Sequence, residues 1–230
     1  MVLTVLLPIA VLGLLIVAGA LLFSRGREGL DLAPRNLIRL YLYVASLAGI
    51  LLLVIGLSGV LTAGFAFAFG NGFVYGAPVG PIAVRPCPPN EPGCVPQGDI
   101  NERQRQEQDR RRADDLIRGI TFTTFGGLFW GAHWMARRGV MGPDEGQSAL
   151  RRGYLMLGTV VFGLATIILL PTGIYQALSN LILPPVEGSF RPGAGESLAG
   201  GLVTAPAWLV FLWLVVRDVR GTRPVAAVMA

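Results

Sequence analysis

Five long runs of apolar residues alternate with polar connections along the chain. They cover residues 2–23, 40–65, 116–136, 154–178 and 198–216. Each run exceeds the roughly 18 residues that mark a candidate transmembrane helix. The pattern therefore predicts an all-α integral membrane protein with five transmembrane helices.

The first run, 2–23, has no basic residue before it and is followed by Arg25 and Arg27. A secretory signal carries its positive charge ahead of the apolar run and a small-residue cleavage site behind it. This segment has the opposite polarity. We therefore expect a retained helix with its N-terminus outside.

Arginine is unevenly divided between the two sides that these runs define. Eleven arginines fall in the first connection, the third connection and the C-terminal tail, namely Arg25, Arg27, Arg35, Arg39, Arg137, Arg138, Arg151, Arg152, Arg217, Arg220 and Arg223. The short connection on the other side contains Arg191. Because short cytoplasmic loops are enriched in basic residues, we expect the C-terminus in the cytoplasm, and the N-terminus and the long 66–115 connection outside.

That long connection has two parts. Residues 78–96 hold seven of the 16 prolines, which disfavours helix, whereas residues 99–115 alternate arginine with acids at i,i+4 spacing. The second part predicts a solvated helix that continues into the 116–136 run. Cys87 and Cys94, the only cysteines, lie in the first part, where an oxidising compartment favours a disulfide. Free or intermolecular thiols and a redox-active pair are the alternatives, the last disfavoured because C-x-x-C spacing is absent.

The two halves of the chain resemble each other. The alignment pairs Arg39 with Arg152, Tyr41 with Tyr154, Trp134 with Trp213 and Arg138 with Arg217. Each half starts and ends on the same side, so the repeat is parallel, about an axis along the membrane normal. We interpret Arg39, Tyr41, Arg152 and Tyr154 as membrane anchors.

The predicted organisation has four parts. Residues 1–35 form an N-terminal transmembrane helix and its cytoplasmic connection. Residues 36–138 form the first two-helix repeat, with 66–115 as its extracytoplasmic loop. Residues 139–220 form the second two-helix repeat, and 221–230 a cytoplasmic tail.

Composition supports the membrane assignment. Apolar residues make up 53% of the 230 residues and charged residues only 14%, against about 25% charged in soluble domains. All 19 basic residues are arginine, and the net charge is +5. Because the arginines flank apolar runs or stand among acids, we assign the charge to the membrane flanks and expect no nucleic-acid partner.

Four short patterns resemble a bacterial polytopic membrane family known as domain of unknown function 5671. They are Arg39-x-Tyr41-Leu42-Tyr43, Arg112 to Asp115, the pair His133 and Trp134, and Ala149 to Tyr154. The resemblance covers about residues 36–220; the second half departs from it by having Leu212 and Trp213 where the first has His133 and Trp134. It implies a multi-pass protein of the bacterial inner membrane and no particular chemistry. The 2–23 helix and the cysteine-bearing loop look like additions.

His133 is the sole histidine and lies near the end of the 116–136 run, between Trp130 and Trp134. It fits an aromatic interface belt, or alternatively a single axial ligand to a haem or chlorin. Gly127 and Gly131 form G-x-x-x-G on nearly the opposite face. We expect that small face to pack against another helix, and His133 to point toward lipid or a different partner.

Paired small or kinked positions recur in the two halves. They are Ser58 and Gly59 in the first half and Pro171, Thr172 and Gly173 in the second. Such interruptions can mark a transport site at the membrane midplane, although helix packing explains them as well. No nucleophile, base and orienting group converge, so we expect no enzyme, and no metal site.

These observations favour an accessory or scaffolding subunit of a larger integral membrane complex, with an energy-converting complex as one option. Its partners would be other membrane subunits and lipids, and no cofactor of its own is expected. A small-solute or ion transporter with a site between the repeats is the alternative.

Overall fold

The computed structural model describes residues 34–78, 97–140, 148–184 and 190–221. Its helices are α2 (Pro34–Phe69), α3 (Asn71–Tyr75), α4 (Gln97–Val140), α5 (Ala149–Ile182) and α6 (Gly195–Gly221), and its strands are β1 (Ala77–Pro78) and β2 (Phe190–Arg191). The predicted 2–23 helix and the predicted Cys87–Cys94 disulfide lie outside the described residues.

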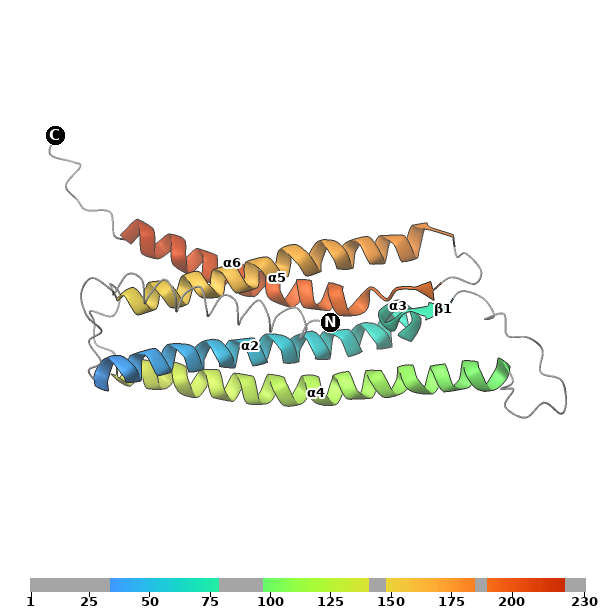
Figure 1. Ribbon diagram of the computed structural model, residues 1–230, viewed down its shortest axis with the longest axis horizontal. Helices are drawn as coiled ribbons and strands as arrows, with labels where there is room; N and C mark the ends of the chain where they lie inside the picture. The colour runs from blue at the N-terminus through green and yellow to red at the C-terminus, as the bar shows by residue number, and fades with distance from the viewer. Residues whose placement is uncertain (1–33, 79–96, 141–147, 185–189, 222–230) are drawn as a thin grey trace, which may run out of the picture.

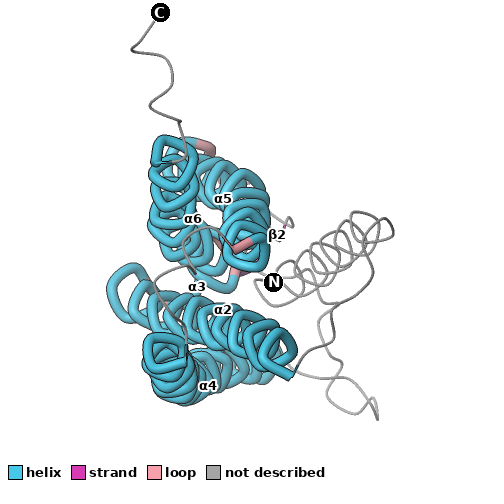
Figure 2. The backbone as a smooth tube through the Cα atoms, turned by 90° about the vertical axis from the view of Figure 1, so that its left-hand side faces the viewer, coloured by secondary structure: helices cyan, strands magenta, loops and turns pink. Residues whose placement is uncertain are grey.

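The four long helices form two antiparallel hairpins (Figure 1). α2 pairs with α4, and α5 pairs with α6. α2 also contacts both helices of the second hairpin, so it lies between α4 and the α5–α6 pair (Figure 2). α2 and α5 run in one direction and α4 and α6 in the other. These directions are the ones that a parallel repeat requires.

Three of the described helices are long and apolar enough to cross a membrane: Leu37–Phe69, Leu150–Ile182 and Gly195–Arg220. They contain the predicted runs 40–65, 154–178 and 198–216 and extend each by a few residues. Within its four described ranges, the structure therefore confirms a predominantly helical protein with three candidate membrane helices.

α4 contains the third predicted run, 116–136, but does not qualify as a span by apolar character. Glycine, threonine and a histidine dilute its apolar residues between 116 and 136. The prediction that the charged segment continues into this run is confirmed, because α4 is one helix of 44 residues.

Glycines bring α2 and α4 into backbone contact. A Cβ added to Gly56 would lie 2.7 Å from the Phe122 carbonyl carbon, and one added to Gly126 would lie 2.9 Å from the Leu53 Cα atom. Only glycine allows such an approach without moving a helix. The contact face of α4 therefore includes Gly126, one residue before the predicted Gly127.

The prediction that Gly127 and Gly131 form the packing face is wrong within the described bundle. A Cβ on Gly127 would make an ordinary contact with the Leu53 side chain at 3.8 Å, and one on Gly131 would meet nothing within 4 Å. One residue turns a helix by about 100°. Gly126 thus faces α2, whereas Gly127 lies beside the contact and Gly131 faces away from it.

Large side chains hold part of the second hairpin further apart. Gly173 lies against the Leu198 backbone near the turn, but further along α6 the rings of Trp208 and Phe211 cover Gly163 and Gly158. Phe211 is buried in the main apolar core with Phe162 and Val54 of α2. The core therefore lies where α2 meets α5 and α6.

A small turn structure joins the hairpins at the end where α2 and α5 finish. β1 pairs antiparallel with β2, and the Ala194 amide donates to the Phe73 carbonyl of α3 at 2.8 Å. Gly76, between α3 and β1, has φ +82°, which favours glycine. We call this the turn end of the bundle, and the opposite end the arginine end.

Candidate functional site

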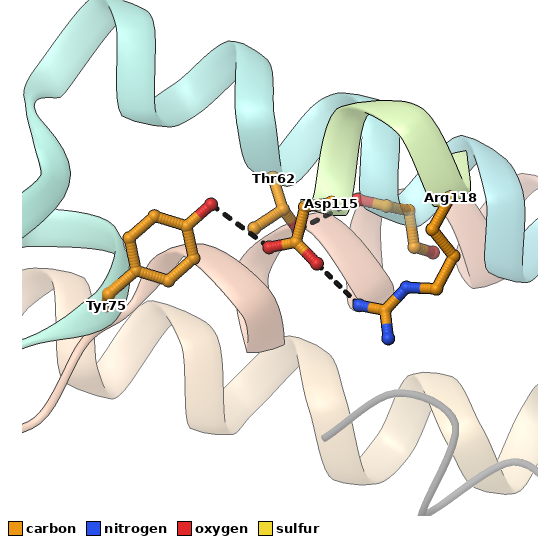
Figure 3. Close-up of polar contacts among 5 residues, drawn as sticks. Thr62, Tyr75, Asp115 and Arg118 are labelled. Atoms are coloured by element: carbon orange, nitrogen blue, oxygen red, sulfur yellow. Dashed lines mark hydrogen bonds and ion pairs between the residues drawn. The ribbon is translucent and has the colours of Figure 1, made fainter. Parts of the chain in front are cut away.

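A nearly buried carboxylate anchors the turn end. The side chain of Asp115, on α4, is 11% exposed. The Tyr75 hydroxyl donates to its Oδ2 at 3.0 Å, and the Arg118 guanidinium donates to its Oδ1 at 2.5 Å (Figure 3). Each carboxylate oxygen therefore has its own donor, as a buried charge requires.

Tyr75 is fixed as the donor of this pair. Burial raises the pKa of the Tyr75 hydroxyl, and the charge and hydrogen bond of Asp115 raise it further, while Arg112 lowers it. The phenol therefore stays protonated over the physiological range. α3 is thereby tied to α4 by a hydrogen bond to a charged acceptor, which is stronger than a neutral one.

Three further contacts hold α4 against the turn end. The Asn71 amide donates to Asp109 at 2.8 Å, and the Gln108 amide donates to the Gly76 carbonyl at 2.7 Å. The Arg112 guanidinium lies 4.5 Å from the centroid of the Phe67 ring. With the Asp115 contacts, they fasten residues 108–115 of α4 to α2, α3 and the segment that follows α3.

Beyond this attachment α4 continues as a charged helix with exposed side chains. An ion pair of 2.6 Å joins Glu107 and Arg111, whose side chains are 62% and 58% exposed. This predicted i,i+4 pair is present. The predicted pair of Arg111 with Asp115 is replaced, because Asp115 bonds to Tyr75 and Arg118 instead. We call residues 97–112 the outer helix.

The predicted anchors gather at the arginine end. Arg151 forms an ion pair of 2.7 Å with Asp218, and Arg152 lies 3.8 Å from the same carboxylate. The rings of Tyr43 and Tyr154 are 5.2 Å apart, with Arg137 placed over both. These contacts join α5 to α6, and α2 to α4 and α5. Arg39 also lies at this end, near the start of α2.

His133, which the sequence predicted to point toward lipid or a partner other than the one on the Gly127–Gly131 face, contacts α2. Its Nδ1 lies 2.7 Å from the Phe129 carbonyl and its Nε2 lies 3.2 Å from the Tyr41 hydroxyl. A carbonyl only accepts, so Nδ1 carries the proton and Nε2 accepts from Tyr41. A haem or chlorin would have to displace Tyr41 to reach this nitrogen.

The two predicted Trp–Arg pairs adopt the same arrangement. Arg138 lies 3.6 Å from the centroid of the Trp134 ring, and Arg217 lies 5.1 Å from that of Trp213. Trp134 in turn contacts Trp130, with ring centroids 6.4 Å apart. Each of the helices that end here, α4 and α6, thus carries a cation–π pair in its last turns.

The residues of the predicted transport site lie against different helices. Gly59 approaches Gly119 of α4, whereas Gly173 approaches Leu198 of α6. The buried Ser58 hydroxyl donates to the Val54 carbonyl of its own helix. Thr172 is exposed, follows the exposed Pro171, and donates to the Ile168 carbonyl. Each half of the predicted site is therefore engaged within its own hairpin.

Sequence reasoning missed the Tyr75–Asp115 pair. Asp115 is the last acid before an apolar run, and a carboxylate at such a boundary needs partners when it is buried. Tyr75 follows the α2 span by a few residues and is followed by Gly76. Over the four described ranges, no three His, Cys, Asp or Glu side chains cluster as a metal site would.

Comparison with known proteins gives one match. No curated protein and no solved structure matches the chain. A family model described as "Domain of unknown function (DUF5671)" matches residues 97–210, a narrower range than the 36–220 suggested by the short patterns. The match covers α4, α5 and most of α6, and leaves out α2. Residues 97–210 are therefore similar to this family of domains of unknown function.

Proposed function

We propose that this protein is an accessory or scaffolding subunit of a larger integral membrane complex, and that it docks a partner subunit through the outer helix. The proposal includes five membrane-spanning helices, with the 2–23 run and the 116–136 part of α4 added to the three candidate spans. It also includes a bacterial inner membrane location, with the turn end outside and the arginine end in the cytoplasm. The division of arginines between the two ends supports this orientation.

The observation that carries the proposal is the ordered outer helix. α4 has 44 residues, which at about 1.5 Å per residue is roughly 66 Å, twice the ~30 Å hydrocarbon core of a bilayer. The outer helix is the part of α4 at residues 97–112, and an isolated helix of about that length is only marginally stable in water. Here the contacts of Asp109, Gln108 and Asp115 with the turn end keep it ordered.

Pre-ordering lowers the entropy lost when a partner binds. The outer helix has five arginines and four acids, so its net charge is small and long-range steering by it is weak. A partner would recognise its local charge geometry.

The composition of the described spans favours docking over transport. Their charged residues lie close to their ends, at Arg39, Arg151, Arg152, Glu196, Arg217, Asp218 and Arg220. Ion pathways usually place ionisable groups inside the membrane. The hydroxyls of Ser58 and Thr172 bond to their own helices.

The test is purification from the native membrane in mild detergent, with the masses of co-purifying subunits and the absorption spectrum recorded. The wild-type chain should retain a stoichiometric membrane partner. A variant that exchanges one ion pair, Glu107→Arg with Arg111→Glu, keeps the net charge and the i,i+4 pair while reversing the local field. It should lose the partner but keep its helix content by circular dichroism.

Arg220→Gln is the matched control, because Arg220 is an exposed arginine at the opposite end of the bundle. It should keep the partner. If the wild-type chain purifies alone, and vesicles containing it show solute flux abolished by Ser58→Ala and Thr172→Ala, the transporter alternative replaces the subunit proposal.

A further inference from the structure

An apolar groove lies between the two hairpins, beside the central helix α2. It has a volume of about 740 Å3 and is lined by α2 from Ile50 to Gly64, by α6 from Leu202 to Phe211, and by Trp130 of α4. Along α2 it extends over 15 residues, from Ile50 to Gly64, and the 14 steps between them span roughly 21 Å at 1.5 Å per residue. That is more than half of a ~30 Å hydrocarbon core, enough for the part of a lipid chain within one leaflet.

Toward the arginine end of the bundle, the last lining residues of the groove are Ile50 of α2, Trp130 of α4, and Val210 and Phe211 of α6. From Trp130, α4 continues through Trp134 to Arg138 at i,i+4 steps, which keeps all three on one side of the helix. The 6.4 Å contact of the two indoles and the 3.6 Å stacking of Arg138 on Trp134 make this a continuous stripe.

The other wall ends in the same way. From Val210, α6 continues through Trp213, three residues on, to Arg217, four further on, again on one side of the helix. The Arg217 guanidinium is 5.1 Å from the Trp213 centroid. On both helices, the turns that follow the groove lining therefore carry an arginine stacked on a tryptophan.

We propose that this groove binds one acyl chain of an anionic phospholipid, with the phosphate-bearing headgroup held by Arg138 and Arg217. Charge at this end favours an anion. The described arginines here are Arg39, Arg137, Arg138, Arg151, Arg152, Arg217 and Arg220, against the single described acid Asp218, which already pairs with Arg151 and Arg152.

The chemistry of the two parts selects a lipid over other occupants. The tail site offers aliphatic and aromatic side chains. The only hydrogen-bonding side-chain group among the lining residues is the indole N–H of Trp130, so a polar solute gains little there. Guanidinium groups bind phosphate oxygens in a fork geometry, and basic pockets between membrane helices recognise anionic headgroups. The site is independent of the outer helix, so it stands whether or not the proposed docking is correct.

The first experiment measures lipid retention by native mass spectrometry of the full chain in mild detergent. Phosphatidylglycerol and phosphatidylcholine with identical acyl chains are added at equal concentrations. The wild-type chain should retain one phosphatidylglycerol in preference to phosphatidylcholine. Arg138→Gln with Arg217→Gln should lower that retention roughly tenfold to thirtyfold, as expected for removing two basic contacts.

Matched controls separate the site from general charge. Arg103→Gln with Arg105→Gln removes the same charge from exposed positions of the outer helix and should leave retention unchanged. Leu57→Trp fills the groove and should lower retention of both lipids, whereas Leu178→Trp, on the exposed face of α5, should not.

The second experiment measures the fluorescence of the native tryptophans in the wild-type chain. Phosphatidylglycerol with brominated acyl chains should quench Trp130 more than brominated phosphatidylcholine at the same mole fraction, and Trp130→Phe should remove that difference. Equal binding of the two lipids, unaffected by the arginine substitutions, would overturn the headgroup assignment. A dimer, or another helix filling the groove with no lipid retained, would overturn the proposal as a whole.

Discussion

Substituting alanine at Gly126 should separate α2 from α4, whereas the same change at the next residue should not. At Gly126 the new Cβ would lie 2.9 Å from the Leu53 Cα and from the Leu52 carbonyl carbon. Both are backbone atoms, so no side chain can rotate away. Restoring an ordinary contact of 3.4 Å with these two atoms requires the helices to move apart by about 0.5 Å, and the Leu53 amide nitrogen, which lies closer still, requires a larger shift. Such overpacking costs roughly 1–3 kcal/mol.

At Gly127 the new Cβ would lie 3.8 Å from the Leu53 Cδ1 atom, an ordinary contact. Alanine is there favoured over glycine by its helix propensity, by up to about 1 kcal/mol. The two variants differ by one position and have the same composition. Both substitutions gain this helix propensity, so it cancels in the comparison, and we expect Gly126→Ala to be less stable than Gly127→Ala by about 1–3 kcal/mol, the cost of overpacking.

The assay is reversible unfolding in mixed micelles, followed by far-ultraviolet circular dichroism as the mole fraction of dodecyl sulfate rises. Gly131→Ala serves as a second control, because its Cβ would meet nothing within 4 Å. If Gly127→Ala or Gly131→Ala destabilised the protein as much as Gly126→Ala, the register between α2 and α4 would be wrong. The G-x-x-x-G face would then be the true contact.

Three other predictions concern the turn end, the topology and the cysteines. Tyr75→Phe should lower the free energy of unfolding near neutral pH by roughly 1.5–3 kcal/mol, because the charged Asp115 loses a donor. The pKa of Tyr75 is raised in the folded state. The stabilisation by the Tyr75 hydroxyl is therefore complete below pH about 10, the ordinary tyrosine value, and is lost as the pH rises further. A constant stability difference between wild type and Tyr75→Phe from pH 8 to 12 would contradict this. In intact cells, a cysteine introduced at Gly80 in a chain lacking Cys87 and Cys94 should react with an impermeant maleimide. A cysteine introduced at Gly142 should react only after permeabilisation. Equal labelling of the two positions would overturn our orientation. Non-reduced peptide mapping of the native chain should recover Cys87 and Cys94 as one linked species, and alkylation of both without reductant would refute the disulfide.

The positions of the long apolar runs were enough to locate the three candidate spans. The three candidate spans begin and end within a few residues of the predicted runs, because a run of aliphatic side chains between arginines leaves a helix few alternatives in a membrane. The continuity of α4 was also predictable, since nothing between Asp99 and Asp115 interrupts a helix. The charged i,i+4 pattern continues directly into the apolar run.

The contacts between helices were less accessible to sequence reasoning. A helical wheel shows which residues share a face but not which face meets a neighbour, so Gly127 and Gly131 were preferred over Gly126 by their spacing alone. The partner's register decides between them, here through Leu53 of α2. In the same way, the pairing of His133 with Tyr41 depends on a residue 92 positions away.

The Tyr75–Asp115 bond was hidden for a different reason. Tyr75 lies on a five-residue helix, too short to produce a periodic pattern, and the bond joins it to a residue on the other side of the proline-rich segment. The turn at Gly76, the pairing of β1 with β2 and the hydrogen bonds of Asn71 and Gln108 together hold this short helix beside α4. Short connecting elements of this kind are set by tertiary contacts and leave little trace in the sequence.

The glycine face of α4 has a consequence for how the protein is made. α4 is not apolar enough to count as a span by itself, and α2 covers three of its small residues, Gly119, Thr123 and Gly126. If α4 crosses the membrane, as we propose, it enters at least cost together with α2, because the pair exposes side chains such as Ile117, Phe125 and Leu128 to lipid. α2 leaves the ribosome first, so it is already available when α4 emerges. Biogenesis would then proceed by insertion of preformed hairpins, and a chain lacking α2 should leave α4 on the wrong side of the bilayer.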